Sequence, residues 1–133
     1  TDLKFVIDFD SFDKSDLSLN FLIIDKFFET SDRKNMLSLS LNELLKKISE
    51  IDKDLDDKSD DHLLKKFVLP GTSIIEAVFR ILILNGNKAM SIPEMEENLK
   101  IAWATVIYLK SYTQETILEM LLSENEYFIV KQD

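Results

Sequence analysis

The chain has 133 residues, of which 45% are hydrophobic and 31% charged, a composition typical of one ordinary globular domain or two very small ones. It contains two glycines and no cysteine, which argues against phosphate-cradling loops, nucleophile elbows, disulfides and thiolate chemistry. The net charge is −9, and both halves are acidic, with 11 basic against 16 acidic residues up to residue 66 and 5 against 9 after it. A phosphate backbone would be repelled by either half unless the cations gather on one face.

The apolar runs are short and interrupted by charge, so none is expected to span a bilayer. No basic segment precedes an apolar stretch in the manner of a signal peptide. We therefore expect a cytoplasmic protein without membrane contact.

The first part of the chain predicts a strand followed by a helix. Apolar and charged residues alternate across residues 3–10, which is typical of a half-buried strand. Apolar residues recur at helical spacing across 16–29, and Ser15 or Asp16 is placed to cap that helix. Residues 30–35 are expected to form a loop.

A capping box marks the next helix. Ser40 and Glu43 have the S-x-x-E spacing that satisfies two backbone donors, so a helix is predicted over 40–51. Residues 52–62 follow as a run of charge, and residues 63–71 as a short apolar segment that stops at a Pro-Gly pair.

Two further capping boxes are expected in the second half. Ser73 and Glu76 precede a strongly apolar helix that ends at Asn-Gly. Ser91 and Glu94 precede another helix, whose proline in the first turn is tolerated because its missing N–H would have no partner there.

The end of the chain predicts a helix and a strand. Residues 101–109 are compatible with either a continued helix or a strand, and their β-branched and aromatic residues favour the strand. Ser111 or Thr113 is expected to cap the last helix, and 127–131 to be a strand.

A shift of 51 residues aligns an apolar helix, a loop and a capping-box helix in the first half with the same series in the second. Ser40 then falls on Ser91 and Glu43 on Glu94. Two capped amphipathic helices can also match in this way by chance, so a repeat of two helix-turn-helix units and two unrelated helix pairs both stay open.

Residues 71–99, "GTSIIEAVFRILILNGNKAMSIPEMEENL", resemble the opening of a winged helix of the HARE-HTH type, found in the delta subunit of bacterial RNA polymerase and in some chromatin proteins. Residues 115–130 would supply its third helix and following strand, so the resemblance extends over 71–131. The connection from Leu99 to Thr113 is longer than in that family, and "SENEY" replaces the usual glycine and aspartate before the final strand.

The resemblance implies an α+β fold, mainly α, with a winged-helix-like unit at 67–133 that carries short strands. The strand and two helices of 1–66, together with the acidic run, form a second unit that is compatible with a degenerate winged helix. We expect the two units to pack as one compact domain.

The nearest approach to a metal site is His62 beside the aspartates of the acidic run. The D-x-D-x-D pattern of 52–56 matches the start of a calcium loop, but Asp57 stands where the turn requires glycine and Leu63 where a glutamate should close the site. No further histidine or cysteine is available for zinc. We expect no metal and no cofactor.

Catalysis is not expected either. Twenty-five carboxylates guarantee that some lie close together, so their proximity carries no information. Nothing in the sequence supplies an activated nucleophile, a positioned imidazole or a glycine turn for an oxyanion. We predict no catalytic residue and a protein that is not an enzyme.

The last helix has the position of a DNA-reading helix but the opposite charge. It carries Glu115 and Glu119 and no lysine or arginine, and reading bases would require cations or amides at its start. Such a face favours a partner protein with a basic surface, to be sought in a transcription or chromosome-associated complex. Trp103 is expected in the core, whereas an exposed aromatic could anchor a partner. The expected partner-binding residues are Tyr112, Gln114, Glu115, Glu119 and Glu124.

Two alternatives remain open at this point. A DNA-binding regulator could use the three dibasic pairs of the first half, although acidic residues flank each pair. An accessory or assembly subunit of an enzyme complex would need no nucleic acid. The candidate DNA-contacting residues are Arg33, Lys34, Lys46, Lys47, Lys65 and Lys66.

Overall fold

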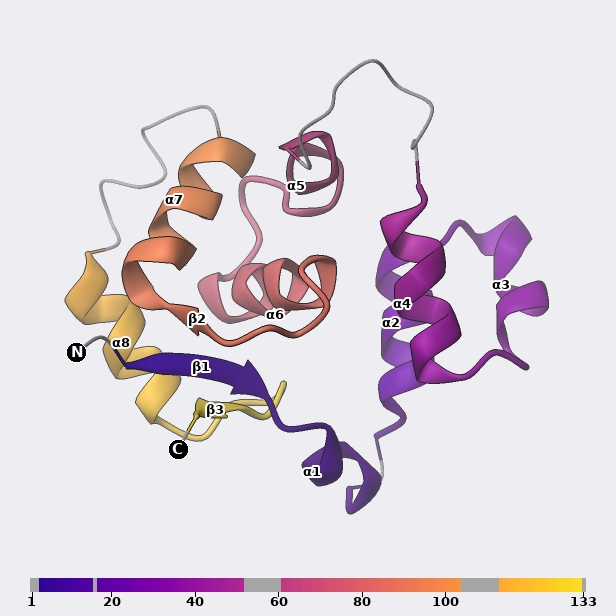
Figure 1. Ribbon diagram of the computed structural model, residues 1–133, viewed down its shortest axis with the longest axis horizontal. Helices are drawn as coiled ribbons and strands as arrows, with labels where there is room; N and C mark the ends of the chain where they lie inside the picture. Colours follow the sequence, from indigo (N-terminus) through magenta and orange to yellow (C-terminus); the bar gives the residue numbers. More distant parts are fainter. Residues whose placement is uncertain (1–2, 16, 52–60, 104–112, 133) are drawn as a thin grey trace. The chain divides into compact units, whose positions relative to one another are not determined.

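A computed structural model describes residues 3–15, 17–51, 61–103 and 113–132 (Figure 1). The chain divides into two compact units. Unit 1 combines residues 1–8 with 57–133, and unit 2 comprises residues 9–56. Helices with one small antiparallel sheet make the described fold α+β and mainly α, as the sequence predicts.

Unit 1 contains four described helices and a three-stranded antiparallel sheet. The helices are α5 (Asp61–Phe67), α6 (Ile74–Leu84), α7 (Ile92–Ala102) and α8 (Gln114–Leu122). The strands are β1 (Lys4–Ile7), β2 (Met90–Ser91) and β3 (Ile129–Lys131), in the order β2-β1-β3. The central strand therefore comes from the start of the chain, and its neighbours come from the second half (Figure 1).

The apolar helix α6 has clear signals at both ends. The Ser73 side chain accepts a hydrogen bond from the Glu76 N–H and caps its start. At its end Gly86 has φ 75°, a left-handed conformation that glycine adopts without penalty, and the Asn87 N–H donates to the Leu82 carbonyl at 2.7 Å. This Schellman-type ending turns the chain directly toward β2.

Side-chain amides complete the sheet on both sides of the Ile7–Ile129 pair. Asn87 accepts from the Ile7 N–H at 2.8 Å and donates to the Ile7 carbonyl at 2.9 Å. Asn125 does the same for Ile129, at 3.0 and 2.9 Å. Each amide therefore acts as a substitute strand residue where the backbone ladder is too short, which leaves fewer unpaired groups at the sheet edge.

The core of unit 1 is apolar and continuous. Trp103 from the end of α7 is 1% exposed, and Phe5 of the central strand and Phe79 of α6 are both fully buried. Other large buried side chains come from the helices and strands around them, namely Val78, Ile81, Leu82, Met95, Leu99, Ile117, Leu121 and Ile129. Trp103 thus lies in the core, as expected from the sequence.

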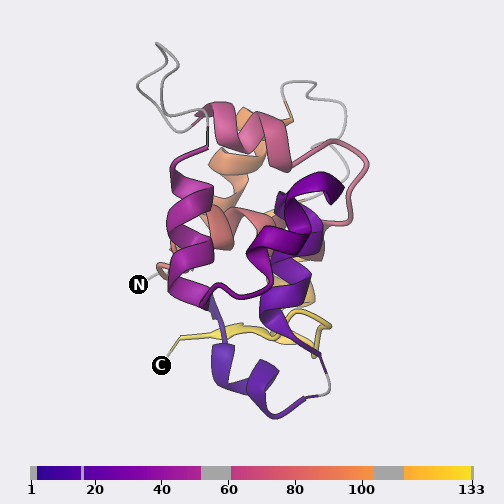
Figure 2. The same ribbon diagram turned by 90° about the vertical axis from the view of Figure 1, so that its right-hand side faces the viewer.

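Unit 2 is smaller and helical throughout its described elements. It consists of α1 (Phe9–Asp13), α2 (Leu19–Phe27), α3 (Thr30–Met36) and α4 (Leu41–Ser49). Helices α2 and α4 lie side by side (Figure 2). Their buried residues include Ile23, Phe27, Leu44 and Ile48. The capping box of Ser40 and Glu43 is fully formed, as predicted.

The first elements differ from the predictions in three places. The strand is limited to 4–7, because helix α1 begins at Phe9. Helix α2 is capped by Ser18; the Ser15 hydroxyl instead donates to the Phe12 carbonyl and closes the turn after α1. Residues 30–35, expected to be a loop, form most of α3.

Tertiary contacts explain α3, which has no buried residue of its own. The guanidinium of Arg33 donates to the backbone carbonyls of Asp25 and Phe28 and pairs with the Asp25 carboxylate at 3.2 Å. These contacts tie α3 to the end of α2, and a pattern based on apolar periodicity cannot detect them.

The unit boundary also differs from the expectation of a division at residue 66. Strand β1 pairs with β2 and β3, and helix α5 contacts α7 and α6, so both belong to unit 1. The 51-residue shift aligns the first residue of α4, Leu41, with the first residue of α7, Ile92. It does not align the first residues of α2 and α6, Leu19 and Ile74. Of the 101–109 segment, α7 includes the first two residues, and 104–109 lie outside the described residues.

Candidate functional site

Helix α8 presents one apolar and one acidic face. The Thr113 side chain accepts from the Thr116 N–H at 3.1 Å and caps the helix, so of the two expected caps Thr113 is the one observed. Ile117 and Leu121 are buried in the core of unit 1. Glu115 and Glu119 are exposed one turn apart, and Leu122, one turn further, is 58% exposed. We call these three residues the α8 face.

The loop from α8 to β3, residues 123–128, is pinned by one side chain. The Asn125 Oδ1 accepts from the backbone N–H groups of Tyr127 and Ile129, at 3.2 and 3.0 Å. The Asn125 Nδ2 donates to the carbonyls of Ser123 and Ile129, at 3.3 and 2.9 Å. Four hydrogen bonds from one amide fix the loop at its start, middle and end.

Phe128 closes the loop in the left-handed region, with φ 53°. This conformation costs a non-glycine residue about 1–2 kcal/mol, and it is held by neighbouring bonds. The Phe128 carbonyl accepts from the Asp8 N–H at 2.8 Å, and its N–H donates to the Asn125 carbonyl at 3.3 Å. The strained residue is therefore fixed between β1 and the loop itself.

Tyr127 anchors the same loop in the core. It is 6% exposed, and its ring stacks on Phe79 with 4.6 Å between centroids. Its hydroxyl donates to the Glu76 Oε1 at 3.0 Å. Burial, and then the hydrogen bond to the Glu76 carboxylate, raise the pKa of Tyr127 far above its usual value.

The Glu76 carboxylate connects this anchor to two helices. Its other oxygen pairs with the Arg80 Nη2 at 3.1 Å, one turn along α6. The Arg80 Nη1 donates to the Phe67 carbonyl at the end of α5, at 2.8 Å. A tyrosine, a carboxylate and a guanidinium thus join the loop, α6 and α5 in one partly buried network.

Beside the loop lies a hollow of about 440 Å³ at the start of α6. Its apolar lining comes from Ile74 and Ile75 of α6 and Met120 of α8. Its polar lining comes from Ser73 and from the loop residues Glu124, Asn125 and Glu126. Glu124 and Glu126 are exposed, and no lysine or arginine is among these seven lining residues, which we call the acidic hollow.

Three of the five expected partner-binding residues belong to the α8 face or the acidic hollow. Glu115 and Glu119 are on the α8 face, and Glu124 lines the acidic hollow. Gln114 is exposed, but its amide donates to the Glu96 Oε1 of α7 at 3.2 Å. Tyr112 lies outside the described residues.

The sequence did not identify Ile75, Met120 or Glu126 as residues that line the acidic hollow. Ile75 lies on α6 and the other two lie on or after α8, so only the contact between these helices brings them together. The sequence could have indicated that Glu126 is exposed near Glu124, because both lie in a polar stretch between a helix and a strand.

The dibasic pairs are divided between the two units. Arg33, Lys34, Lys46 and Lys47 belong to unit 2, and Lys65 and Lys66 belong to α5 of unit 1. All except Arg33 are exposed. Arg33 is engaged by Asp25 and by two backbone carbonyls, so this guanidinium is already committed within unit 2.

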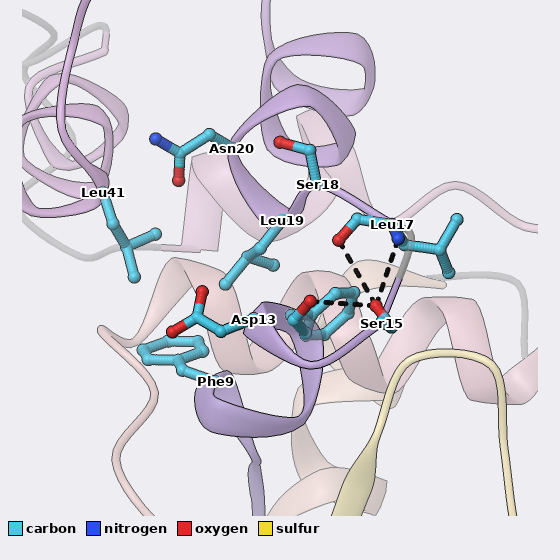
Figure 3. A pocket seen from close by; sticks show the side chains of 9 residues that line it. Phe9, Asp13, Ser15, Leu17, Ser18, Leu19, Asn20 and Leu41 are labelled. Carbon is cyan, nitrogen blue, oxygen red and sulfur yellow. Dashed lines mark hydrogen bonds between the residues drawn. The ribbon is translucent and has the colours of Figure 1, made fainter.

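Unit 2 has a hollow of its own, of about 610 Å³ (Figure 3). Its lining includes the apolar side chains Phe9, Leu17 and Leu41 and the carboxylate of Asp13. The Ser15 hydroxyl donates to the Phe12 carbonyl at 2.9 Å and accepts from the Leu17 N–H at 3.1 Å, so it shapes the wall between α1 and α2 (Figure 3). Of the two serines that line this hollow, Ser15 closes the turn after α1 and Ser18 caps α2.

Within the described ranges, no three or more histidine, cysteine, aspartate or glutamate side chains are grouped so as to hold a metal ion. His62 lies in the first turn of α5 and is half-buried. The aspartates of 52–60 lie outside the described residues. In the same described ranges, no helix is long and apolar enough to cross a membrane.

No protein-family model, curated protein or solved structure matches the chain.

Proposed function

We propose that this is a small non-enzymatic protein of the cytoplasm that acts by docking the α8 face onto a basic surface of a partner protein. One observation carries the proposal: Glu115 and Glu119 are exposed on the helix, and Glu124 and Glu126 are exposed on the pinned loop that follows. Residues 113–130 contain no lysine or arginine to neutralise them.

The charge arrangement favours an external partner. Like charges one turn apart destabilise a helix by about 0.2–0.5 kcal/mol, and Glu115 and Glu119 have this spacing. Cations of a docked protein would replace that repulsion with attraction, and they would also speed and orient the encounter. A nucleic-acid backbone would add further repulsion.

We also propose that unit 1 is a rearranged winged helix, which makes a transcription or chromosome-associated complex the first place to seek the partner. What supports this is the series α6, β2, α7, α8, β3 with a three-stranded sheet. In a winged helix the last two strands form a hairpin, the wing. Here β1 occupies the central position and precedes the helices, so β1 and β3 are not joined as a hairpin.

Binding to a random DNA duplex over a range of salt concentrations tests this proposal. We expect weak or no binding at physiological salt. Tight binding with a steep dependence on salt would contradict it, since that dependence measures released counterions. Loss of that binding on replacing Lys46 and Lys47 with alanine would favour the DNA-binding alternative.

Affinity capture from a native extract tests whether partner proteins bind through the α8 face. The Glu115→Gln/Glu119→Gln variant should lose partners that the wild-type protein retains. The matched control is Glu50→Gln/Glu97→Gln, which removes the same charge from exposed positions elsewhere. Equal retention by all three proteins would overturn the role of the α8 face.

A further inference from the structure

We infer that the acidic hollow is the docking site for one large apolar side chain carried within a basic segment of a partner protein. This inference rests on the proposed function and adds to it the chemistry of the partner. The α8 face would attract the basic surface, and the acidic hollow would fix its position.

The hollow combines an apolar floor with an anionic rim. Ile75 and Met120 are half-buried, so part of their apolar surface meets solvent. Covering that surface is favourable at roughly 25 cal/mol per Å². Glu124 and Glu126 stand at the rim, where they can pair with cations on both sides of an apolar anchor. A neutral or acidic segment would gain only part of these interactions.

The rim is held in place before a partner arrives. Glu124 and Glu126 flank Asn125, which is fixed by its four hydrogen bonds, and the loop is anchored by buried Tyr127. Binding therefore does not require ordering of this backbone, a cost that weakens docking onto loose loops. The left-handed Phe128 fits the same interpretation, since strain is retained where the surrounding structure fixes a particular shape.

A structural role for the two carboxylates must be distinguished from docking. They lie beside the start of α6, where negative charge stabilises a helix. That end already has Ser73 as its cap and Glu76 in its first turn. The structural role predicts a loss of stability on neutralising Glu124 and Glu126, whereas docking predicts a loss of binding at unchanged stability.

The experiment uses a random peptide library displayed on phage and selected on the full chain. We expect enrichment of peptides in which lysines or arginines surround one leucine, phenylalanine or methionine. An enriched peptide is then made with a fluorescent label, and its affinity is measured for the wild-type chain and two variants. Glu124→Gln/Glu126→Gln alters the rim, and Glu115→Gln/Glu119→Gln removes equal charge from the α8 face.

The rim variant should weaken the peptide about tenfold, and the α8-face variant about threefold or less. Replacing the apolar anchor of the peptide with serine should also weaken binding about tenfold. The rim variant should unfold at the wild-type temperature, and the α8-face variant at that temperature or slightly above it, because it relieves the repulsion between Glu115 and Glu119. In methyl spectra, the shifts caused by the peptide should be largest at Ile74, Ile75 and Met120.

Several outcomes would overturn the inference. These are enrichment of acidic or purely apolar peptides, no enrichment, equal weakening by both variants, or no effect of the anchor substitution. Loss of stability in the rim variant without loss of peptide binding would assign the carboxylates to α6. Partner capture that still depends on Glu115 and Glu119 would leave the proposed function standing in each case.

Discussion

Unit 1 and unit 2 each contain an apolar helix and a helix that begins with a serine cap, yet the two surround different kinds of core. In unit 1, α6 and α8 pack against the strands β1 and β3, and side-chain amides complete the sheet. In unit 2, α2 packs against α4 and α3, and no strand lies within its described residues. Both units leave some large apolar side chains exposed, such as Leu37 of unit 2 at 63% and Leu122 of unit 1 at 58%. Similar helix signals therefore do not determine whether a unit forms around a sheet.

The difference has a consequence for where binding surfaces arise. Unit 1 fixes the loop of residues 123–128 through the Asn125 hydrogen bonds, and this loop presents carboxylates beside an apolar hollow. In unit 2 the Ser40 side chain caps α4 and the Arg33 guanidinium binds Asp25 and Phe28, so these polar groups are used within the unit. In unit 1 the loop is hydrogen-bonded by Asn125 to Ile129 of β3, so the sheet helps to hold the site preorganised.

The largest expected effect comes from the two cores. Phe79→Ala should lower the free energy of unfolding of unit 1 by about 3–5 kcal/mol, because it removes a fully buried ring and its stacking on Tyr127. The one tryptophan, Trp103, lies in unit 1, so its fluorescence reports the loss during denaturation.

The matched variant in unit 2 is Leu44→Ala, which also empties a fully buried position and should cost about 2–5 kcal/mol. It should shift the circular dichroism transition more than the Trp103 transition. Identical shifts of both signals would show that the units unfold together and would remove the contrast drawn between them.

A smaller effect is expected from the amide that extends the sheet. Asn87→Ala removes two hydrogen bonds to Ile7 and places alanine at φ 59°, so it should cost about 2–3 kcal/mol. Asn87→Gly tolerates the backbone conformation and should lose only the part due to the bonds. Denaturation followed by Trp103 fluorescence measures both. Equal stability of Asn87→Gly and wild type would mean that the amide bonds contribute little.

These amides also mark the limit of what the sequence can predict. The caps at Ser40, Ser73 and Ser91 were found because a cap and its partner lie within four residues. The bonds from Asn87 to Ile7 join residues 80 positions apart, and no local pattern encodes them. The placement of β1 in unit 1 was missed for the same reason.

The candidate site, too, could be predicted from the sequence only in its local features. The exposure of Glu115 and Glu119 follows from helical spacing, because Ile117 and Leu121 point to the opposite side. The acidic hollow could not be predicted, since Ile75 and Met120 meet only through the packing of α6 and α8. Periodicity gives the face of a helix but not the neighbour that covers it.

Tyr127→Phe should have a still smaller effect, about 1 kcal/mol at neutral pH, because it removes one hydrogen bond and keeps the ring. Its pH dependence is more informative. The pKa of Tyr127 is raised in the folded protein, so its contribution is complete below the unfolded value near 10 and is lost as the pH rises above it.

Alkaline titration of stability therefore distinguishes the two proteins. The wild type should lose stability above about pH 10 more steeply than Tyr127→Phe, because only the wild type has this hydroxyl to ionise. Denaturant midpoints measured by Trp103 fluorescence give both curves. Parallel curves would show that the hydroxyl bond to Glu76 does not couple to folding.

Effects of similar size are expected from the two capping serines at the starts of α4 and α7. Ser40 is exposed, and Ser40→Ala should cost about 0.5–1 kcal/mol; Ser91 is 3% exposed, and Ser91→Ala should cost about 1–2 kcal/mol. Hydrogen bonds from the Ser40 backbone and side chain lower the pKa of Glu43, so its stabilising effect is present at neutral pH and is lost as the pH falls through the folded value. The loss of stability at low pH, measured from the circular dichroism transition, should therefore be less steep for Ser40→Ala than for the wild type. A larger cost for Ser40→Ala than for Ser91→Ala would show that burial does not decide how much a capping serine contributes to stability.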